Sequence, residues 1–418
     1  MTQTARPAAP EVATAPRRPG KVRVATALGP AFVAAIAYVD PGNFATNFAG
    51  GASVGYGLLW VVLLANLVAM PIQFLAAKLG AVTGQSLPRL CRDKMRKPAA
   101  WFMWGQAEVV AMATDLAEFV GAAIGLNLLF RVPLPIAALF TAVLSFVILS
   151  LQRRGHRPFE LAIGSLLALI CGGFFYLVVM APPSASASLG GLVPNFSGSD
   201  TLLLAVGIIG ATVMPHAIYL HSGLMSDRAT GMTFPERLRL LRFERLDIGI
   251  AMTLAGLVNL SMLAVAAKLF HGNHTGEMTL EAAHTGLGQM VGGAAALAFA
   301  AALLASGISS SSVGTAAGQI VMEGFLGRQI PLWLRRLITM SPALVLLCSG
   351  VDPTQALVLS QVVLSFGIPF ALVALLVLTS RRDLMGDQVN TRTTIVSMTA
   401  IVVVISSLNI LLLAQQIF

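Results

Sequence analysis

Long apolar stretches, repeated along the whole chain, constrain what this sequence can fold into more than any other feature. Runs of about 20 apolar residues are long enough for a helix to cross the hydrocarbon core of a bilayer. Hydrophobic residues make up 56% of the chain and charged residues only 11%, whereas a soluble domain has about a quarter of its residues charged. A large soluble helical protein would also need polar stripes along its helices, which this sequence lacks. We therefore expect an all-α membrane protein.

Eleven apolar segments separated by short loops can be distinguished. Helix is the only structure open to them, because backbone groups in lipid must be hydrogen-bonded within the segment. Residues 1–23 are rich in Pro, Ala, Thr and Arg, lack the apolar run of a signal peptide, and are expected to form a disordered cytoplasmic tail. The eleven segments cover residues 24–50, 54–82, 100–129, 134–151, 159–181, 200–225, 246–270, 286–322, 334–350, 354–379 and 394–417.

The positions of Lys and Arg predict the orientation of these segments, because basic residues are enriched in cytoplasmic loops. Twenty-four of the 27 basic residues fall in the N-terminal tail and in the second, fourth, sixth, eighth and tenth loops. Lys78 lies at a helix end on that side, and Arg131 and Lys268 fall opposite. The pattern predicts a cytoplasmic N-terminus and, after eleven crossings, an extracytoplasmic C-terminus. It also accounts for the net charge of +9 without nucleic-acid binding.

The first and sixth segments are each interrupted near the middle by a proline motif. The motifs are DPGN at residues 40–43 and MPH at residues 214–216. Proline removes a helical hydrogen bond and clashes with the preceding turn, and glycine adds local freedom. A lone proline in a membrane helix is usually only a kink, but here each motif opens one of two five-segment halves, 24–181 and 200–379, that enter from opposite sides. Matched interruptions in inverted halves predict a transport site near the membrane midplane.

The interrupted segments carry residue types that bind divalent metal ions. Asp40 lies near the centre of its segment, where a carboxylate costs roughly 2.5–3.5 kcal/mol to insert and is normally paired or functional. Asn43 offers an amide oxygen, and the carbonyls of Ala37 and Ala211 are the nearest to lose their helical partners. Oxygen ligands alone suit Ca²⁺ or Mg²⁺, but the thioether of Met214 shifts the preference toward Mn²⁺, Fe²⁺ and later transition metals. Methionine on its own more often fills an apolar gap.

Three carboxylates on the third segment point to protons. Glu108, Asp115 and Glu118 are spaced seven and three residues apart, which places them along one face of a helix. They can form a structural ion-pair network with Arg335 or Arg336 on the ninth segment. They can also act as a relay that passes protons from Asp40 toward the cytoplasm.

Two histidines follow the second proline motif. His216 titrates near physiological pH and is a plausible first partner for a proton leaving Asp40. His221 lies five residues further along the same helix. A histidine in that position is more often a packed, hydrogen-bonded residue than a participant, so both roles stay open for His221.

Three motifs in order resemble the signatures of the Nramp family (natural resistance-associated macrophage protein). They are the run 29–47, which contains DPGNFATN, the MPH motif, and ATDLAEF at residues 113–119. The resemblance extends from about Gly29 to the end of the chain. It implies a LeuT-like fold of inverted five-helix repeats followed by an eleventh helix, and proton-coupled uptake of Mn²⁺ or Fe²⁺, with Cd²⁺ as a further substrate. This chain has eleven segments, fewer than the animal members of the family, and the resemblance therefore implies a bacterial protein of the inner membrane.

The resemblance also assigns residues. It implies that the carboxylate of Asp40, the amide of Asn43, the thioether of Met214 and the carbonyl of Ala211 bind the ion. Ala37 is implied to join the ligands in some conformations, and Gln361 to approach the ion when the site is occluded. For the proton pathway, the resemblance implies His216, Asp115 and Glu118. Additional candidates for that pathway are Glu108, Arg336 and His221.

Other functions remain as alternatives or are excluded. A sodium-coupled amino-acid or amine symporter has the same architecture but does not need a thioether. A metal channel is a second alternative. The sequence contains no phosphate-binding loop for ATP and no nucleophile, base and orienting group at enzyme spacing, and its three cysteines are far apart. We therefore expect no enzyme activity and no resident cofactor. The serine-rich run 306–312 favours close helix packing.

Overall fold

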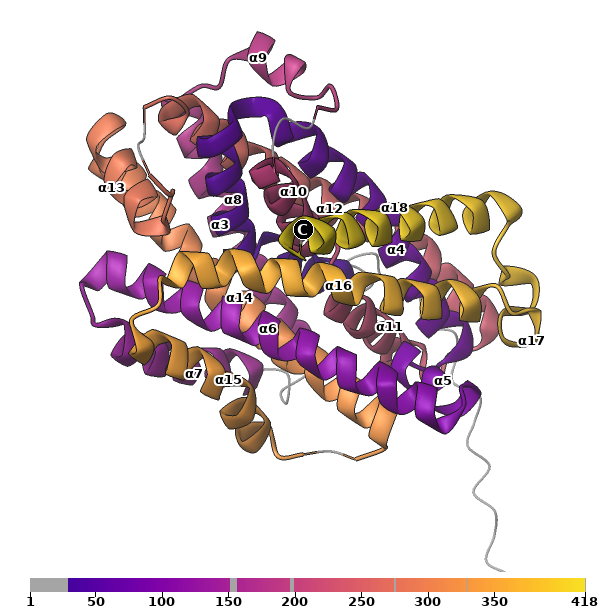
Figure 1. Cartoon of the computed structure of the whole chain (residues 1–418). Helices are drawn as coiled ribbons and strands as arrows, with labels where there is room; N and C mark the ends of the chain where they lie inside the picture. Colours follow the sequence, from indigo (N-terminus) through magenta and orange to yellow (C-terminus); the bar gives the residue numbers. More distant parts are fainter. Residues whose placement is uncertain (1–28, 151–155, 196–198, 274–275, 329, 418) are drawn as a thin grey trace, which may run out of the picture.

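The computed structural model describes residues 29–150, 156–195, 199–273, 276–328 and 330–417, and in these ranges its regular structure is entirely helical (Figure 1). The tail predicted for residues 1–23 lies outside the described residues. Eight helical stretches are long and apolar enough to cross a membrane, and two shorter apolar helices accompany them. The chain is therefore a multi-pass helical membrane protein.

Each of the eleven apolar segments contains at least one helix, although the number of membrane crossings stays a prediction. The first half contains α2 (Pro30–Ile36), η1 (Ala37–Val39), α3 (Pro41–Val54), α4 (Leu59–Thr83), α6 (Lys97–Phe130), α7 (Leu134–Ser150) and α8 (His156–Met180). The second half contains α10 (Ser199–Thr212), α11 (Pro215–Ala229), α12 (Phe234–Phe270), α14 (Gly293–Leu326), α15 (Leu332–Ser349) and α16 (Pro353–Thr379), and α18 (Arg392–Ile417) follows.

Several loops also contain short helices: η2 (Gly55–Leu58), α5 (Leu87–Lys94), α9 (Ala185–Gly190), α13 (Leu280–Met290), α17 (Arg382–Met385) and η4 (Gly386–Gln388). Two segment boundaries differ from those expected. Helix α12 begins at Phe234 rather than near residue 246, because Thr233 and Glu236 form a capping box that starts the helix among charged residues. The segment expected at 286–322 is divided between α13 and α14 by Gly292, whose φ of 127° no helix accommodates.

Both proline motifs interrupt their helices as predicted. We call residues 37–41 the first break and residues 211–215 the second break. Pro41 and Pro215 each occupy the first position of a new helix, where the missing N–H is not needed. The same missing N–H deprives the carbonyl four residues earlier of its helical donor, so Ala37 and Ala211 each lose one partner. Asp40 and Met214, in extended conformations, join the helices on either side.

The helices that carry the breaks lie in the middle of the bundle. Helix α10 packs on α3 and α16, while α12 packs on α2, α3 and α4. Helices α16 and α18 run side by side in Figure 1, with α5 and α17 at one end of the bundle and α13 at the other.

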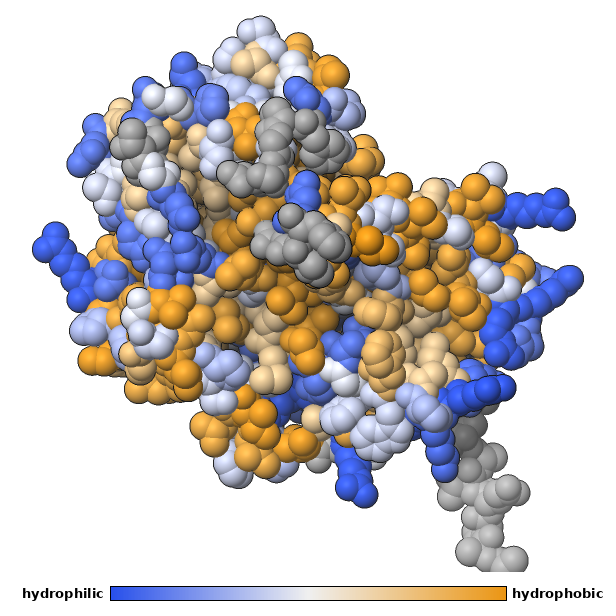
Figure 2. Space-filling model, in the orientation of Figure 1, coloured by the Kyte–Doolittle hydropathy of each residue, from blue (hydrophilic) through white to orange (hydrophobic). Residues whose placement is uncertain are grey.

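The surface of the bundle is apolar and part of its interior is polar. Figure 2 shows hydrophobic side chains over the middle of the visible face and hydrophilic ones gathered toward its margins. Large apolar side chains such as Phe175 (72% exposed) and Val396 (69% exposed) face outward. Asp40, Glu118 and Asp247 are completely buried. Charged groups at such positions are costly and are usually functional or paired.

Candidate functional site

Asp40 and Asn43 form the polar core of the first break. Asp40 Oδ1 accepts hydrogen bonds from the backbone N–H of Asn43 (2.8 Å) and from Asn43 Nδ2 (2.8 Å). The first of these bonds caps the N-terminus of α3, which fixes the carboxylate relative to the helix. Asn43 Nδ2 also donates to the carbonyl oxygen of Ala211 at 3.0 Å. The two breaks, 168 residues apart in sequence, are therefore joined by one amide group.

Two buried oxygens at this junction have no hydrogen-bond partner among the described residues, Asp40 Oδ2 and Asn43 Oδ1. The amide orientation of Asn43 follows from its neighbours, because both groups around Nδ2 are acceptors and a flipped amide would set oxygen against oxygen. Buried polar atoms are nearly always paired in proteins. Two unpaired oxygens beside freed carbonyls make a donor set suited to a cation.

The remaining predicted ligands belong to the same breaks. Ala37 begins η1 and Ala211 lies in the last turn of α10, and their carbonyls are the two that Pro41 and Pro215 leave without a helical donor. Met214 caps α11 without a side-chain hydrogen bond and is completely buried. The site thus combines a carboxylate, an amide, backbone carbonyls and a thioether.

Gln361 of α16 lies against both breaks. A Cβ on Gly42 would overlap the side chain of Gln361, and a Cβ on Gly210 would overlap its backbone carbonyl. Glycine at these two positions is what permits the close approach. Gln361 Nε2 donates to Ser360 Oγ at 3.1 Å, while Gln361 Oε1 is buried and has no partner in the described part of the chain. A third unpaired oxygen therefore belongs to a residue packed against the first break.

His216 lies in the first turn of α11, directly after the second break, and contacts α6. Its Nδ1 is 3.2 Å from Thr114 Oγ1, and that hydroxyl donates to the carbonyl of Val110 at 3.0 Å. Because the hydroxyl has one hydrogen, it accepts from Nδ1–H, and the lone pair of the ring is left on Nε2. His216 Nε2 is buried without a partner among the described residues. The ring is therefore arranged to accept a proton at Nε2.

Asp115 and Glu118 of α6 share their surroundings with Arg336 of α15. Glu118 is within electrostatic reach of Asp40, Asp115 and Arg336. Both oxygens of Glu118 are buried beside the carboxyl of Asp115, and the Glu118 carboxylate lies against Gly314, where a Cβ would overlap it. Acidic groups therefore extend from the first break toward α15.

Arg336 is held by polar groups of α14. It donates to Ser311 Oγ at 2.7 Å and to Thr315 Oγ1 at 3.1 Å. Arg335 instead pairs with Glu108, with Nη2 3.1 Å from Oε2. The ion-pair arrangement considered from the sequence is thus present for Glu108, while Asp115 and Glu118 lie deeper and face Arg336.

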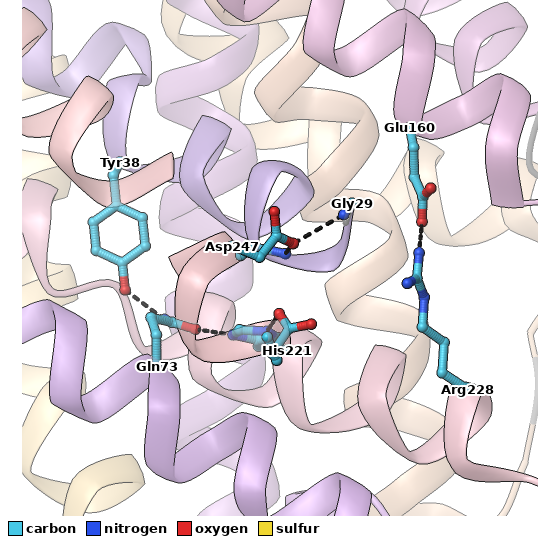
Figure 3. Close-up of polar contacts among 9 residues, drawn as sticks. Gly29, Tyr38, Gln73, Glu160, His221, Arg228 and Asp247 are labelled. Atoms are coloured by element: carbon cyan, nitrogen blue, oxygen red, sulfur yellow. Dashed lines mark hydrogen bonds and ion pairs between the residues drawn. The ribbon is translucent and has the colours of Figure 1, made fainter. Parts of the chain in front are cut away.

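His221 belongs to a separate chain of hydrogen bonds, shown in Figure 3. Its Nδ1 is 2.7 Å from Gln73 Oε1 and its Nε2 is 2.8 Å from Glu244 Oε1. Gln73 in turn donates to the hydroxyl of Tyr38, a residue of the first break. Both ring nitrogens are occupied, which is the packed arrangement named as an alternative above. A role for His221 in proton transfer stays a prediction.

The same region holds the start of α2 in place. Asp247 Oδ2 accepts from the backbone N–H of Gly29 (2.9 Å) and of Ala31 (3.1 Å), two donors that a helix N-terminus leaves unpaired (Figure 3). Arg228 of α11 pairs with Glu160 of α8 nearby (Figure 3). These contacts tie α2 and α11 to α12 and α8.

Sequence reasoning missed Tyr38, Gln73, Glu160, Glu244 and Asp247. A signal existed for three of them, because Glu160 is an acid within an apolar segment and Glu244 and Asp247 are acids spaced like one helical face. Starting the seventh segment at 246 assigned Glu244 to a loop. The earlier start of α12 buries both acids completely.

A cavity of about 280 Å³ opens between α3, α10 and α16, the helices that carry Asn43, Ala211 and Gln361. Its lining includes Ser53, Glu277 and Asp352. Burial raises the pKa of the neighbouring Glu281 carboxyl, and the charge of Asp352 raises it further. The cavity lies between the ends of α3 and α10 that are remote from the breaks and the start of α16, and no residue of either break lines it. Helices α2 and α11 are tied down by the contacts described above.

Among the described residues, no group of three or more His, Cys, Asp and Glu is arranged to hold a metal ion. A zinc-type cluster is thus not found in the described part of the chain. The candidate site is of another kind, because it has one carboxylate and depends on amide, carbonyl and thioether groups.

The fold and the site together define a helical membrane protein of the kind that carries solutes between two interrupted helices. The comparison with known families agrees with this class. Residues 31–415 match the model of the natural resistance-associated macrophage protein-like family. This chain belongs to the Nramp family. Its relatives are named as transporters rather than enzymes.

Two relatives illustrate the similarity. The chain is 53% identical over 393 residues to the divalent metal cation transporter MntH of Deinococcus radiodurans, covering 93% of this chain and 90% of that protein. It is 50% identical over 389 residues to the MntH of Bacillus subtilis, covering 93% and 92%.

Solved structures show the same relationship. A mutant of the Eremococcus coleocola manganese transporter superposes with a TM-score of 0.84 at 32% identity, covering 96% of this chain and 89% of that chain. Mhp1, a nucleobase-cation-symport-1 family transporter, superposes with a TM-score of 0.55 at 15% identity, covering 83% and 77%. The likeness to Mhp1 concerns the fold alone.

Proposed function

We propose that this protein imports divalent transition-metal ions, Mn²⁺ above all and also Fe²⁺ and Cd²⁺, together with protons. The observation that carries the proposal is the junction of the two breaks, where Asn43 bonds both Asp40 and the Ala211 carbonyl and two buried oxygens lack partners. The relatives named as divalent metal and manganese transporters support the substrate class.

The ligand chemistry favours a transition metal over a hard cation. Asp40 supplies the negative charge that offsets dehydration, and Asn43, Ala37 and Ala211 supply neutral oxygens. Met214 supplies a soft sulfur that Ca²⁺ and Mg²⁺ do not use but that Mn²⁺, Fe²⁺ and Cd²⁺ accept. Gln361 is proposed to contribute its free oxygen when the site closes.

Protons are proposed to leave the site on the side of α6. A divalent ion and a proton compete for the carboxylate of Asp40, so binding of the metal releases the proton. His216 Nε2 can accept it, and Glu118 is within electrostatic reach of Asp40. Asp115, Arg336 and the Glu108–Arg335 pair would extend the route, and His221 is a more distant candidate.

Transport is proposed to follow alternating access within two inverted repeats, residues 24–181 and 200–379, with residues 394–417 as an eleventh helix. The cavity beside α3, α10 and α16 is the proposed entrance, and the contacts that hold α2 and α11 form the proposed closed exit. The Lys and Arg distribution supports a cytoplasmic N-terminus and an extracytoplasmic C-terminus in a bacterial inner membrane. We propose no role for ATP, nucleic acid or a resident cofactor, and membrane lipid surrounds the bundle.

Uptake into liposomes tests the proposal. Purified protein is reconstituted, and entry of Mn²⁺, Fe²⁺, Cd²⁺, Ca²⁺ and Mg²⁺ is measured while internal pH is recorded. We expect saturable entry of the first three ions with acidification of the interior. Sodium-dependent uptake of an amino acid without metal uptake would favour the symporter alternative. Metal flux that does not saturate and moves no protons would favour a channel.

A further inference from the structure

The Asp40 carbonyl of the first break accepts from the backbone N–H groups of Asn43 and Phe44. Between Ala37 and Asp40 lie two further carbonyls, those of Tyr38 and Val39. Each of these two carbonyls is occupied by a side chain from another helix. Asn259 Nδ2 of α12 donates to Tyr38 O at 2.7 Å, and Ser306 Oγ of α14 donates to Val39 O at 2.6 Å.

Both donors are fixed in place. Asn259 and Ser306 are completely buried. Asn259 Oδ1 accepts from Asn47 Nδ2 of α3 at 3.1 Å, so Asn259 joins the backbone of the first break to the helix that follows it. Both side chains bond directly to the backbone of the first break.

The freed carbonyls are thus divided into two sets. Tyr38 and Val39 are bound by side chains of other helices, whereas Ala37 loses its α-helical donor because of Pro41 and begins the 3-10 turn of η1, so only the local backbone holds its carbonyl. On the second break, the corresponding carbonyl of Ala211 is held by Asn43, which itself has an unpaired oxygen. The number of oxygens that can reach an ion is set by this division.

We propose that Asn259 and Ser306 are positioning residues that determine metal selectivity by keeping the Tyr38 and Val39 carbonyls out of the coordination shell. This inference rests on the proposed function as a divalent metal transporter. It concerns residues outside the ligand set, on helices that carry no break.

The physical reason lies in coordination number. Ca²⁺ takes six to eight oxygen ligands in a flexible arrangement, whereas Mn²⁺ suits an octahedral site with six ligands and softer transition metals accept sulfur. Two additional carbonyls beside Asp40 would supply the oxygens that Ca²⁺ lacks in a site containing a thioether. Withholding them selects against Ca²⁺ without adding any contact to Mn²⁺.

The other serines of the run 306–312 provide a matched control. Ser309 is completely buried on the same helix, and its hydroxyl donates to Ala305 O at 2.6 Å within α14. Ser309→Ala therefore removes the same atom from the same helix without releasing a carbonyl of the first break. The packing role expected for this run applies to Ser309 but not fully to Ser306.

The test compares Ser306→Ala and Asn259→Ala with Ser309→Ala and the wild type in liposomes. Mn²⁺ uptake is measured across a series of Ca²⁺ concentrations, and Mn²⁺ and Ca²⁺ binding are measured by calorimetry. We expect Ca²⁺ to inhibit Mn²⁺ uptake by Ser306→Ala at a concentration about fivefold lower than for the wild type, a free-energy difference of the size of one hydrogen bond. The Mn²⁺ affinity of this variant should stay within about twofold of the wild-type value. Asn259→Ala should shift in the same direction, and Ser309→Ala should resemble the wild type.

Loss of affinity for both ions in equal proportion would show that Ser306 and Asn259 only stabilise the break, and would overturn the inference. Unchanged Ca²⁺ inhibition in both variants would overturn it as well. A wild type that takes up no Mn²⁺ would instead refute the proposed function, so the two failures are distinguishable.

Discussion

Asp247→Ala should loosen α2, because one carboxylate oxygen holds the start of that helix. The variant removes the hydrogen bonds from Gly29 N (2.9 Å) and Ala31 N (3.1 Å). Hydrogen bonds to a charged group contribute about 1.5–3 kcal/mol each. Asp247 Oδ1 is buried and none of the described residues bonds it, so removing the carboxylate also relieves a desolvation cost of about 1–3 kcal/mol.

The net effect is a destabilisation of docked α2 by about 2–3 kcal/mol, which corresponds to roughly a 30- to 150-fold change in the equilibrium between docked and released states. Asp247→Asn keeps an acceptor oxygen and loses only the charge, so its effect should be about 1 kcal/mol. We therefore expect the stability of docked α2 to decrease in the order wild type, Asp247→Asn, Asp247→Ala.

Hydrogen–deuterium exchange of the peptide that contains residues 30–36 measures this equilibrium directly. Asp383→Ala is the control, because Asp383 forms an exposed pair with Arg381 at 2.8 Å and should leave α2 unaffected. If Asp247→Ala exchanged at the wild-type rate, α2 would be held by apolar packing alone, and the assignment of its N-terminal cap as the main restraint would be wrong.

Three further predictions concern transport. Asp40→Ala should abolish Mn²⁺ uptake in protein that still folds, because neutral ligands cannot offset dehydration of a divalent ion; near-normal uptake would refute the site. Met214→Ala should weaken Cd²⁺ binding by about tenfold and let millimolar Ca²⁺ compete, while much of the Mn²⁺ transport is kept, because an all-oxygen site suits hard cations. Ca²⁺ inhibition equal to that of the wild type, together with unchanged Cd²⁺ affinity, would show that Met214 only fills space. His216→Ala and Asp115→Asn should reduce acid-stimulated uptake more than calorimetric metal affinity, and an equal loss of both would contradict the proton route.

The sequence predicted the breaks partly because proline acts through local covalent structure. Proline alone is not sufficient, since Pro71, Pro342 and Pro369 lie inside the continuous helices α4, α15 and α16. The two breaks could be predicted because each proline stands among polar or metal-binding residue types at matching positions of the two halves. The apolar segments were predictable for a local reason, because each one must satisfy its own backbone. Segment ends were less predictable: the start of α12 depends on the Thr233–Glu236 capping box rather than on hydropathy.

Long-range partners could not be predicted in this way. Nothing near Ser306 in the sequence indicates that its hydroxyl reaches Val39, 267 residues away, rather than its own helix as that of Ser309 does. The partner of Asp247 is likewise a pair of backbone N–H groups, which no residue type reveals. The contacts of Gln361 depend on two glycines on two different helices.

The length of α2 has a thermal consequence. Its seven residues are too few for an independent helix, since isolated helices shorter than about 12–15 residues are marginal in water. Its helicity therefore depends on its neighbours, and we expect that an α2 released from them into water would melt rather than swing as a rigid rod. Melting returns about 1–2 kcal/mol of backbone entropy per residue at room temperature. We therefore expect warming to favour released α2 and cooling to favour docked α2, so that hydrogen–deuterium exchange of these seven residues should rise with temperature.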